Sequence, residues 1–317
     1  MDALSEILKS VRLEGAVYLN AEFTAPWCVQ AQYGLDAVKE RLPRAERVVF
    51  FHFVVEGSVS IPRAGGGVTT ATAGDLILFA QDARQLMGSD VRLKPADAGT
   101  LLASGGPGEM VELNYGGGGE TTRCVCGYLG CSAGVCRPLL DALPPVLRVP
   151  AGAGAGLVRE LLKTAVRETV ASRPGAESLL AKLAELVFVE ALRGYVESLP
   201  PENRGWLAGV RDRNIGRALA LMHREPEREW TVDDLARAAC LSRSAFAERF
   251  ATLVGEPPMQ YLARWRLALA AQSLRSTDDA ITRIAQRSGY ESDAAFSRAF
   301  KREFGMPPAA WRRAIAR

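Results

Sequence analysis

Residues 284–308 read IAQRSGYESDAAFSRAFKREFGMPP, and residues 235–258 read LARAACLSRSAFAERFATLVGEPP. The two stretches are copies of one pattern, because the same residue types recur at a separation of 50 positions. The matching positions are Ser242 with Ser292, Phe246 with Phe296, Phe250 with Phe300, Gly255 with Gly305, and Pro257-Pro258 with Pro307-Pro308. An internal repeat of this kind indicates a structural unit that occurs twice.

Each copy predicts a helix-turn-helix unit. In the first copy Thr231 caps a short helix, Ala239-Cys240-Leu241 form the turn, and Ser242 caps the second helix. The two phenylalanines of each copy lie four positions apart, so both point into a core, and the glycine and prolines that follow end the helix. We expect Cys240, in the turn, to be a core residue. The corresponding segments of the second copy are the helix 280–285, the turn 288–290 and a helix capped by Ser292.

The spacing of the two units suits a DNA duplex. Residues 259–270 predict one long helix between the copies, which fixes their separation. The second helix of such a unit enters the major groove, and two of them can enter successive grooves about one helical turn apart. Residues 211–317 hold 19 Arg and Lys against 13 Asp and Glu, whereas the whole chain has a net charge of +3. This basic end of the chain indicates a polyanionic partner.

The stretch 214–313 resembles the DNA-binding domain of the AraC/XylS-type transcription regulators. In its first half the resemblance is carried by Leu235, Ala236, Ser242, Phe250, Gly255, Pro258, Tyr261, Leu262, Arg264 and Arg266. In its second half it is carried by Ile284, Ala285, Gly289, Tyr290, Ser292, Phe296, Arg298, Phe300, Lys301, Phe304, Gly305, Pro307 and Pro308. The resemblance implies a regulator that binds asymmetric sites in double-stranded promoter DNA and, as most of the family do, activates RNA polymerase.

The resemblance also implies which residues contact DNA. The exposed positions of the recognition helices are Arg243, Ser244, Ala247 and Glu248 in the first copy and Asp293, Ala294, Ser297 and Arg298 in the second. Arg298 is the expected base reader and Arg243 the expected backbone contact. The alanines offer only apolar contact to thymine methyl groups, and Glu248 would have to accept a hydrogen bond from cytosine. Phosphate contacts, or alternatively structural pairs, are expected at Arg264, Arg266, Lys301 and Arg302.

Residues 17–127 have a different texture. Short β-branched and aromatic runs alternate with Gly-rich breaks, which predicts an all-β barrel or sandwich. The runs are 48–55, 58–61, 76–79, 101–103 and 110–113. A short amphipathic helix is expected at 1–16, and the prolines Pro138, Pro144, Pro145 and Pro150 are expected to end the β region.

Helical periodicity returns after a flexible joint at 151–156. Apolar residues form one stripe at 157–166 and a wide one at 179–196, and a linker follows at 199–205. Such a wide stripe is more than one surface helix normally needs. Two interpretations stay open: the second helix packs on the β region, or part of it faces a second copy of the chain in a homodimer.

The β region, over roughly residues 15–200, resembles the cupin-type sensor domain of the RclR-like subset of these regulators. The matching stretches are 51–57, 74–79, 126–127 and 138–147. A cupin metal centre needs about three imidazoles and a carboxylate, but the chain has two histidines, His52 and His223. Relatives often carry histidine where this chain has Gln81, Arg84 and Gln85. A metal-dependent cupin enzyme is therefore not predicted, and His52 is expected to be a hydrogen-bonded barrel residue.

Four of the six cysteines, Cys124, Cys126, Cys131 and Cys136, fall within 13 residues. Three interpretations stay open. They are small buried residues without a role, a redox switch of low-pKa thiols, or a thiolate site for zinc or another thiophilic metal. Cys28 could join such a cluster through the tertiary fold. The spacing is not the tandem C-x-x-C of a zinc ribbon, which ranks the metal site last.

The sequence thus predicts an α+β protein of three parts. They are a cupin-like β-barrel sensor domain at 1–150, a helical linker or dimerisation segment at 151–205, and an all-α domain with two helix-turn-helix units at 211–317. No stretch has the roughly 18 consecutive apolar residues that a membrane helix needs. The chain does not open on a basic and then apolar leader, so we expect a cytoplasmic protein without a membrane partner.

The predicted function is that of a sequence-specific DNA-binding transcription regulator, an activator and not an enzyme. Its control is expected from an unidentified effector sensed in the cupin-like domain, with thiol oxidation or a thiophilic metal at the cysteine cluster as candidates. The alternatives are a small-molecule-responsive regulator whose cysteines have no role, a cupin enzyme with a regulatory DNA-binding tail, and a methyl-accepting thiol protein fused to this tail.

Overall fold

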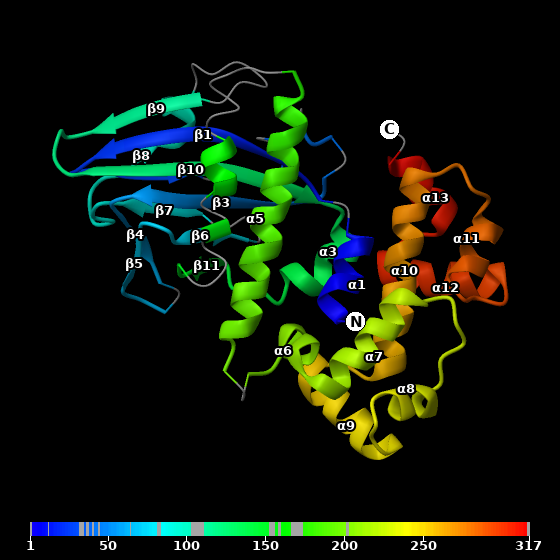
Figure 1. Ribbon diagram of the computed structural model, residues 1–317. Coiled ribbons are helices and arrows are strands. Elements are labelled where there is room, and N and C mark those ends of the chain that lie inside the picture. Colours follow the sequence, from blue (N-terminus) through cyan, green and yellow to red (C-terminus); the bar gives the residue numbers. More distant parts are fainter. Residues whose placement is uncertain are drawn as a thin grey trace. The chain divides into compact units, whose positions relative to one another are not determined.

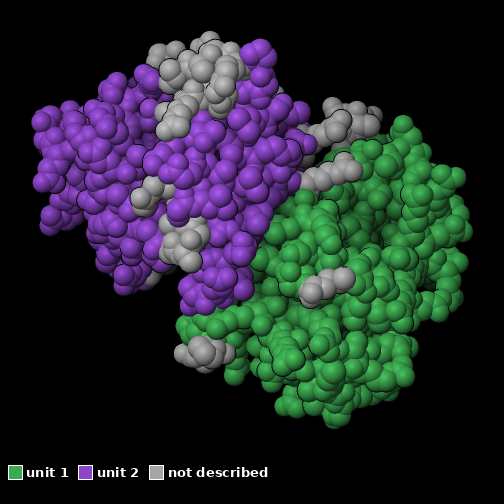
Figure 2. All heavy atoms as spheres, viewed as in Figure 1, with its two compact units in different colours: residues 1–12, 132–142, 199–317 green, residues 13–131, 143–198 purple. Residues whose placement is uncertain are grey.

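The chain divides into two compact units (Figure 2). The helical unit comprises residues 1–12, 132–142 and 199–317, and the β unit comprises 13–131 and 143–198. The computed structural model describes residues 2–11, 13–31, 35, 38–39, 41–43, 45–63, 65–80, 84–102, 111–151, 156–157, 160–165, 174–200 and 203–315. Gln81 and most of the predicted joint at 151–156 lie outside these residues.

Two sheets form the β unit (Figure 1). Its strands are β1 (Glu14–Thr24), β2 (Cys28–Ala31), β3 (Arg47–Glu56), β4 (Ser58–Pro62), β5 (Val68–Thr72), β6 (Leu76–Phe79), β7 (Gln85–Gly88), β8 (Ala96–Asp97), β9 (Val111–Gly116), β10 (Thr121–Cys131) and β11 (Val146–Val149). The larger sheet has the order β11-β6-β3-β10-β1-β9 and the smaller one β5-β4-β7-β2-β8. The two-sheet β architecture is therefore as predicted.

One apolar core fills the space between the two sheets. Side chains of the larger sheet, such as Phe50 and Val54, pack there with Ile61 and Met87 of the smaller sheet. Alternate residues of each strand point inward because the side-chain period of a strand is two. On the opposite face of the larger sheet, Gly127 of β10 leaves room for the Phe51 ring, since a Cβ at position 127 would lie 2.1 Å from Cζ of Phe51.

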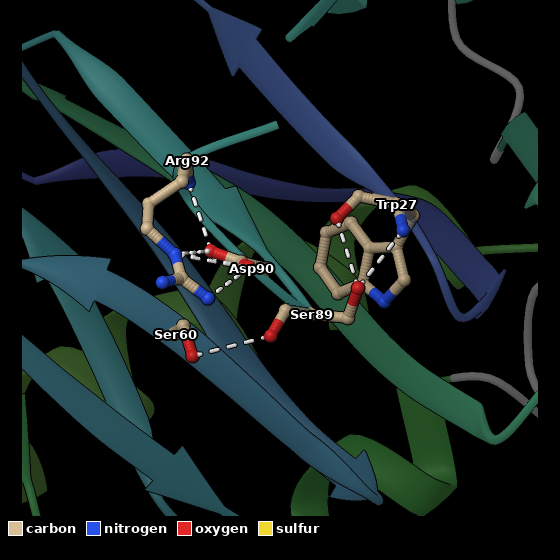
Figure 3. A network of polar contacts seen from close by, with 5 residues as sticks. All are labelled: Trp27, Ser60, Ser89, Asp90 and Arg92. Atoms are coloured by element: carbon tan, nitrogen blue, oxygen red, sulfur yellow. Dashed lines mark hydrogen bonds and ion pairs between the residues drawn. The ribbon is translucent and has the colours of Figure 1, made fainter. Parts of the chain in front are cut away.

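Ser89 joins strands of the smaller sheet at one end (Figure 3). Its Oγ accepts a hydrogen bond from the Trp27 backbone N–H at 2.9 Å and donates to the Trp27 carbonyl at 3.2 Å. The Ser60 hydroxyl donates to the Ser89 carbonyl at 3.5 Å, and the neighbouring Asp90 binds Arg92 at 2.7 Å. Trp27 itself is buried in the core and stacks on Phe23 with the ring centroids 4.1 Å apart. The Ser89 contacts thus tie the residue after β7 to β4 and to the residue before β2, within the smaller sheet.

Helix α5 (Ala176–Ser198) packs along β1 within the β unit. Leu183, Val187 and Leu192 of its wide apolar stripe are buried, which supports the first of the two interpretations of that stripe. Leu179 and Leu186 remain exposed, at 38% and 50% of their surface.

The helical unit holds the predicted repeat. Its helices are α1 (Ala3–Ser10), α3 (Ala133–Leu140), α6 (Trp206–Arg211), α7 (Arg213–Arg224), α8 (Val232–Ala238), α9 (Arg243–Val254), α10 (Pro258–Ser276), α11 (Ile281–Arg287), α12 (Asp293–Phe304) and α13 (Pro308–Ile315). The α8–α9 and α11–α12 pairs are the two helix-turn-helix units, and α10 joins them (Figure 1). In the described part of the chain, no helix is long and apolar enough to cross a lipid bilayer.

Three sequence predictions about local structure were wrong. The first helix ends at Ser10, not at residue 16, because residues from Glu14 onward pair with β10. Leu101, which opens the run 101–103 that was predicted as a strand, instead ends the short helix α2 (Ala98–Leu101), since the Asp97 side chain caps this helix by accepting from the Thr100 N–H at 2.9 Å. Pro138, Pro144 and Pro145 do not end the β region, because β11 follows them and pairs with β6; of the four prolines, Pro150 alone comes after that strand.

Two short helices within the segment 1–150, which was predicted as the sensor domain, belong to the helical unit instead. Helix α1 packs on α7, and α3 packs on α10. The apolar faces of both helices are fully buried, at Ala3 and Ile7 on α1 and at Val135 and Leu139 on α3. Helices α7 and α10 shield these faces from water. The compact units therefore follow different bounds from the predicted segments 1–150, 151–205 and 211–317.

Candidate nucleic-acid interface

The turns of the two helix-turn-helix units have the same backbone geometry. Leu241 N–H donates to the Ala236 carbonyl at 3.0 Å, and Tyr290 N–H donates to the Ala285 carbonyl at 3.1 Å. The residue before each of these donors has a positive φ, which is 54° at Cys240 and 71° at Gly289. Glycine adopts this conformation readily, whereas a side chain there is strained. Cys240 is exposed, so its prediction as a core residue was wrong. Cys240 thus combines a left-handed backbone with an exposed side chain.

The caps and cores of the two units agree with the sequence. Ser242 and Ser292 accept hydrogen bonds from the backbone N–H groups three residues on, at 3.3 and 3.2 Å. The four phenylalanines of the repeat have no exposed surface, and left-handed glycines follow both recognition helices. Each recognition helix, α9 or α12, is thus fixed at both ends and along its inner face.

The predicted DNA-contact residues lie on the outer faces of α9 and α12. Most are exposed, and Ala247 and Ser297 are half-buried. The exposed ones are Arg243, Ser244 and Glu248 on α9 and Asp293, Ala294 and Arg298 on α12. The structure therefore presents all eight on the two helices that a tandem reader would use, four on each.

Each recognition helix begins with a polar contact to the first helix of its own unit. On α9 the Arg243 guanidinium binds Asp233 of α8 at 3.0 Å, and on α12 the Asp293 carboxylate accepts from the Thr282 hydroxyl of α11 at 2.8 Å. The two contacts lie at equivalent positions of the repeat. The residue of the recognition helix is a cation, Arg243, in the first unit and an anion, Asp293, in the second. Sequence reasoning missed Asp233 and Thr282 as partners, because neither is adjacent in sequence to the residue that it binds.

The cationic side chains of the two helices differ in their partners. On α9 the second arginine, Arg249, binds Asp212, whose pKa stays lowered by Arg249 and the α7 N–H groups although burial raises it. On α12, Arg298, Lys301 and Arg302 are exposed, and no described carboxylate forms an ion pair with them. The free positive charge of the interface is therefore concentrated on α12.

Arg264 and Arg266 of α10 have partners within the protein. Arg264 binds Glu256, which follows α9. Arg266 donates to the carbonyls of Pro226 and Arg228, at 2.6 and 2.8 Å, and burial lowers its pKa. These contacts support the structural alternative for both arginines, while Lys301 and Arg302 remain the better candidates for phosphate contacts.

In the β unit, three residues that the sequence analysis named, His52, Gln85 and Cys126, are in contact. His52 on β3 and Cys126 on β10 are paired in register, and His52 Nδ1 lies 2.8 Å from Cys126 Sγ. His52 Nε2 lies 3.0 Å from Oε1 of Gln85. Because an amide oxygen only accepts, Nε2 carries the proton and Nδ1 accepts from the Cys126 thiol. His52 is thus a hydrogen-bonded barrel residue, as predicted.

The cysteine cluster does not assemble into a site. Cys124 and Cys126 lie in the β-unit core, Cys131 ends β10, and Cys136 lies on α3 of the helical unit. Among the described residues, no group of three or more His, Cys, Asp or Glu side chains could hold a metal ion. The hypothesis of a zinc or other metal site at these four cysteines is therefore not supported.

Burial also argues against a low-pKa switch at Cys124 and Cys126. Desolvation raises the pKa of the Cys124 thiol to about 12 and the pKa of the Cys126 thiol well above its usual value. The thiolate is the nucleophile in oxidation, so thiols held protonated react slowly. The interpretation of Cys124 and Cys126 as small buried residues fits best.

Both histidines of the chain should make the protein less stable in mild acid. Burial lowers the pKa of His52 to about 4 and of His223 to about 3, from an ordinary value of 6.5. As the pH falls, the unfolded chain therefore protonates its histidines before the folded chain does. The contribution of the neutral histidines to the free energy of unfolding is fully present only above pH 6.5 and declines towards pH 4. We expect each histidine to cost about 2 kcal/mol between pH 7 and pH 5.

Urea unfolding of the full chain at both pH values measures this loss. His52→Gln should remove its share for the β unit and His223→Gln for the helical unit, so each variant is the control for the other. An unchanged pH dependence in both variants would contradict the assignment.

A chain with two groove-sized helices on one rigid repeat, each with an outward polar face, is a helix-turn-helix DNA-binding protein. Residues 2–197 match the cupin family, and residues 235–314 match a helix-turn-helix domain family. A putative AraC-like transcription regulator of Streptomyces lividans is 33% identical over 315 residues, 99% of this chain and 98% of the relative. The chain belongs to the AraC-like transcription regulators.

Two further relatives have related names. The RCS-specific HTH-type transcriptional activator RclR of Escherichia coli (strain K12) is 26% identical over 318 residues, 99% of this chain and 98% of RclR. The solved DNA-binding domain of AdpA, in complex with a target DNA, is 32% identical with a TM-score of 0.31, over 32% of this chain and 92% of that domain. The relatives are named as regulators, in agreement with the prediction of a regulator and not a cupin enzyme.

Proposed function

We propose that this regulator recognises its promoter mainly through α12, with α9 as the weaker reader. The observation that carries the proposal is the unequal state of the arginines: both arginines of α9 are bound by carboxylates, and Arg298 of α12 is exposed without one among the described residues. An arginine that reads a guanine edge needs both prongs of its guanidinium free. Lys301 and Arg302 would add phosphate contacts beside it.

Control would come from the β unit, and the output would be activation of RNA polymerase at promoter DNA in the cytoplasm. The core position of Cys124 and Cys126 favours an effector other than a thiol oxidant or a metal, which is the small-molecule alternative raised by the sequence. A homodimer would use the outer face of α5, where Leu179 and Leu186 lie seven positions apart and are exposed. That spacing puts both leucines on one side of the helix.

Selection from genomic fragments tests the DNA-binding proposal. The full-length protein is mixed with sheared DNA of its source genome at about 150 mM salt, where non-specific phosphate contacts are weakened. Retained fragments are sequenced and footprinted. We expect a few fragments to be enriched, each protected over two successive major grooves. Retention of random DNA at the same level would refute sequence-specific binding.

A further inference from the structure

Helix α3 belongs by sequence to the β unit and by packing to the DNA-binding repeat. Ser132 alone separates it from β10, and residues 141–145 connect it to β11. The helix nevertheless packs on α10, the helix that joins the two helix-turn-helix units. The close approach is at Gly134, where a Cβ would lie 3.4 Å from the Cβ of Ala268. A Cβ at position 134 is therefore already in van der Waals contact with α10, and we expect an aromatic side chain there to press α3 away from α10.

Next to this contact, the ends of both recognition helices carry an acidic residue. Glu256 follows the glycine that ends α9, and Glu303 lies in the last turn of α12. Arg264 binds Glu256, and Arg137 of α3 has its Nη1 3.9 Å from Oε1 of Glu303. Burial and the charge of Glu303 raise the pKa of Glu256, while Arg264 and Arg137 lower it, so Glu256 lies in the field of all three charges.

The three helices also enclose a small cavity of about 30 Å³, room for about one or two water molecules. Its lining includes Gly134, Arg137 and Pro138 of α3, Arg264 and Ala268 of α10, and Glu303 of α12. One short helix thus contacts the joining helix and supplies a cation to the glutamates at the ends of both readers. Without that cation, Glu256 keeps Arg264 but Glu303 loses its ion pair, and the repulsion between the two glutamates is less compensated.

We propose that α3 is a clamp on the tandem repeat, with Arg137 as the positioning residue, and that the β unit controls DNA binding by moving it. Two readers bind one duplex only while their separation and rotation match successive grooves. A displacement of β10 or β11 reaches α3 through very short connections, and loosening α3 lets the ends of α9 and α12 move apart. The inference rests on the proposed tandem reading of DNA.

The test uses the full chain and the shortest genomic fragment that the wild-type protein retains. Gly134→Phe forces α3 from α10, and Gly134→Ala is its matched control. Arg137→Ala removes the cation, Arg137→Lys restores it, and Asp141→Ala removes the carboxylate that follows α3 and lies 3.4 Å from Arg137. Thermal unfolding of each variant confirms that it is folded. Arg137 is exposed, so its variants keep the test valid even where Gly134→Phe does not fold.

In the wild-type protein we expect a footprint over two grooves and a loss of affinity when one base pair, a rotation of about 36°, is inserted between them. In Gly134→Phe and Arg137→Ala we expect about tenfold weaker binding, protection of the α12 groove only, and no further loss on insertion. Gly134→Ala, Arg137→Lys and Asp141→Ala should behave as the wild type.

Wild-type footprints and an unchanged insertion penalty in Gly134→Phe and Arg137→Ala would overturn the clamp while leaving tandem reading intact. A wild-type footprint over a single groove would instead refute the proposed tandem reading, and the clamp with it. Uniform weakening in Arg137→Ala, with both grooves still protected, would make Arg137 a simple phosphate contact and also overturn the proposal.

Discussion

Arg298→Ala is expected to weaken binding to the selected operator by about 5- to 150-fold, which corresponds to about 1–3 kcal/mol. Arg298 is exposed on the outer face of α12, and no described carboxylate forms an ion pair with it. Its guanidinium is therefore free to form the bidentate contact with a guanine edge that gives this energy. The loss should disappear on operators in which the contacted base pair is changed, because the variant no longer reads it.

The matched control is Arg243→Ala on α9. Its side chain is held by Asp233 at 3.0 Å, so reading a base would first require breaking that pair. We expect a loss at least several-fold smaller than that of Arg298→Ala in the same gel-shift or fluorescence titration. Lys301→Ala should weaken binding to all duplexes alike and reduce the salt dependence by about one phosphate contact. Equal losses for Arg298→Ala and Arg243→Ala would contradict the dominance of α12.

The sequence predicts the repeat well because its determinants are local. Caps such as Ser242 and Ser292, the buried phenylalanine pairs and the terminal glycines act within one or two turns of a helix, and the fold leaves them in place. The ion pairs that separate the two readers are different. Asp233 and Asp212 come to their arginines through helix packing, at 10 and 37 positions along the chain, and periodicity does not encode such contacts.

The cysteine cluster shows the same limit in the β unit. Four cysteines within 13 residues suggest a shared site, but β10 carries Cys124 and Cys126 into the core while Cys136 leaves on α3 with the helical unit. Nearness in sequence therefore did not bring the described side chains together as a group of three or more that could hold a metal ion. The register of β3 against β10, which a single sequence does not give, instead pairs Cys126 with His52. Likewise, the apolar faces of α1 and α3 indicate burial but not which unit covers them.

Phe300→Ala is expected to destabilise the helical unit by about 3–5 kcal/mol, the cost of a large cavity in a packed core. Phe300 has no exposed surface, and its ring centroid lies 5.6 Å from that of Phe296, 4.5 Å from that of Phe304 and 5.9 Å from that of Trp311. Three aromatic rings from α12 and α13 therefore lose a common neighbour. This is a large part of the roughly 5–15 kcal/mol that stabilises a typical domain.

Urea unfolding of the full chain, followed by tryptophan fluorescence, measures the loss, and Phe250→Ala is the matched variant at the equivalent position of the first repeat. Phe250 is equally buried, with its ring centroid 5.7 Å from Phe246 and 5.8 Å from Tyr261, so we expect a similar destabilisation. The two variants should differ in DNA binding, because Phe300 supports α12 and Phe250 supports α9. At a temperature where both remain folded, Phe300→Ala should lose more affinity for the operator. A larger loss in Phe250→Ala would show that α9 is the principal reader.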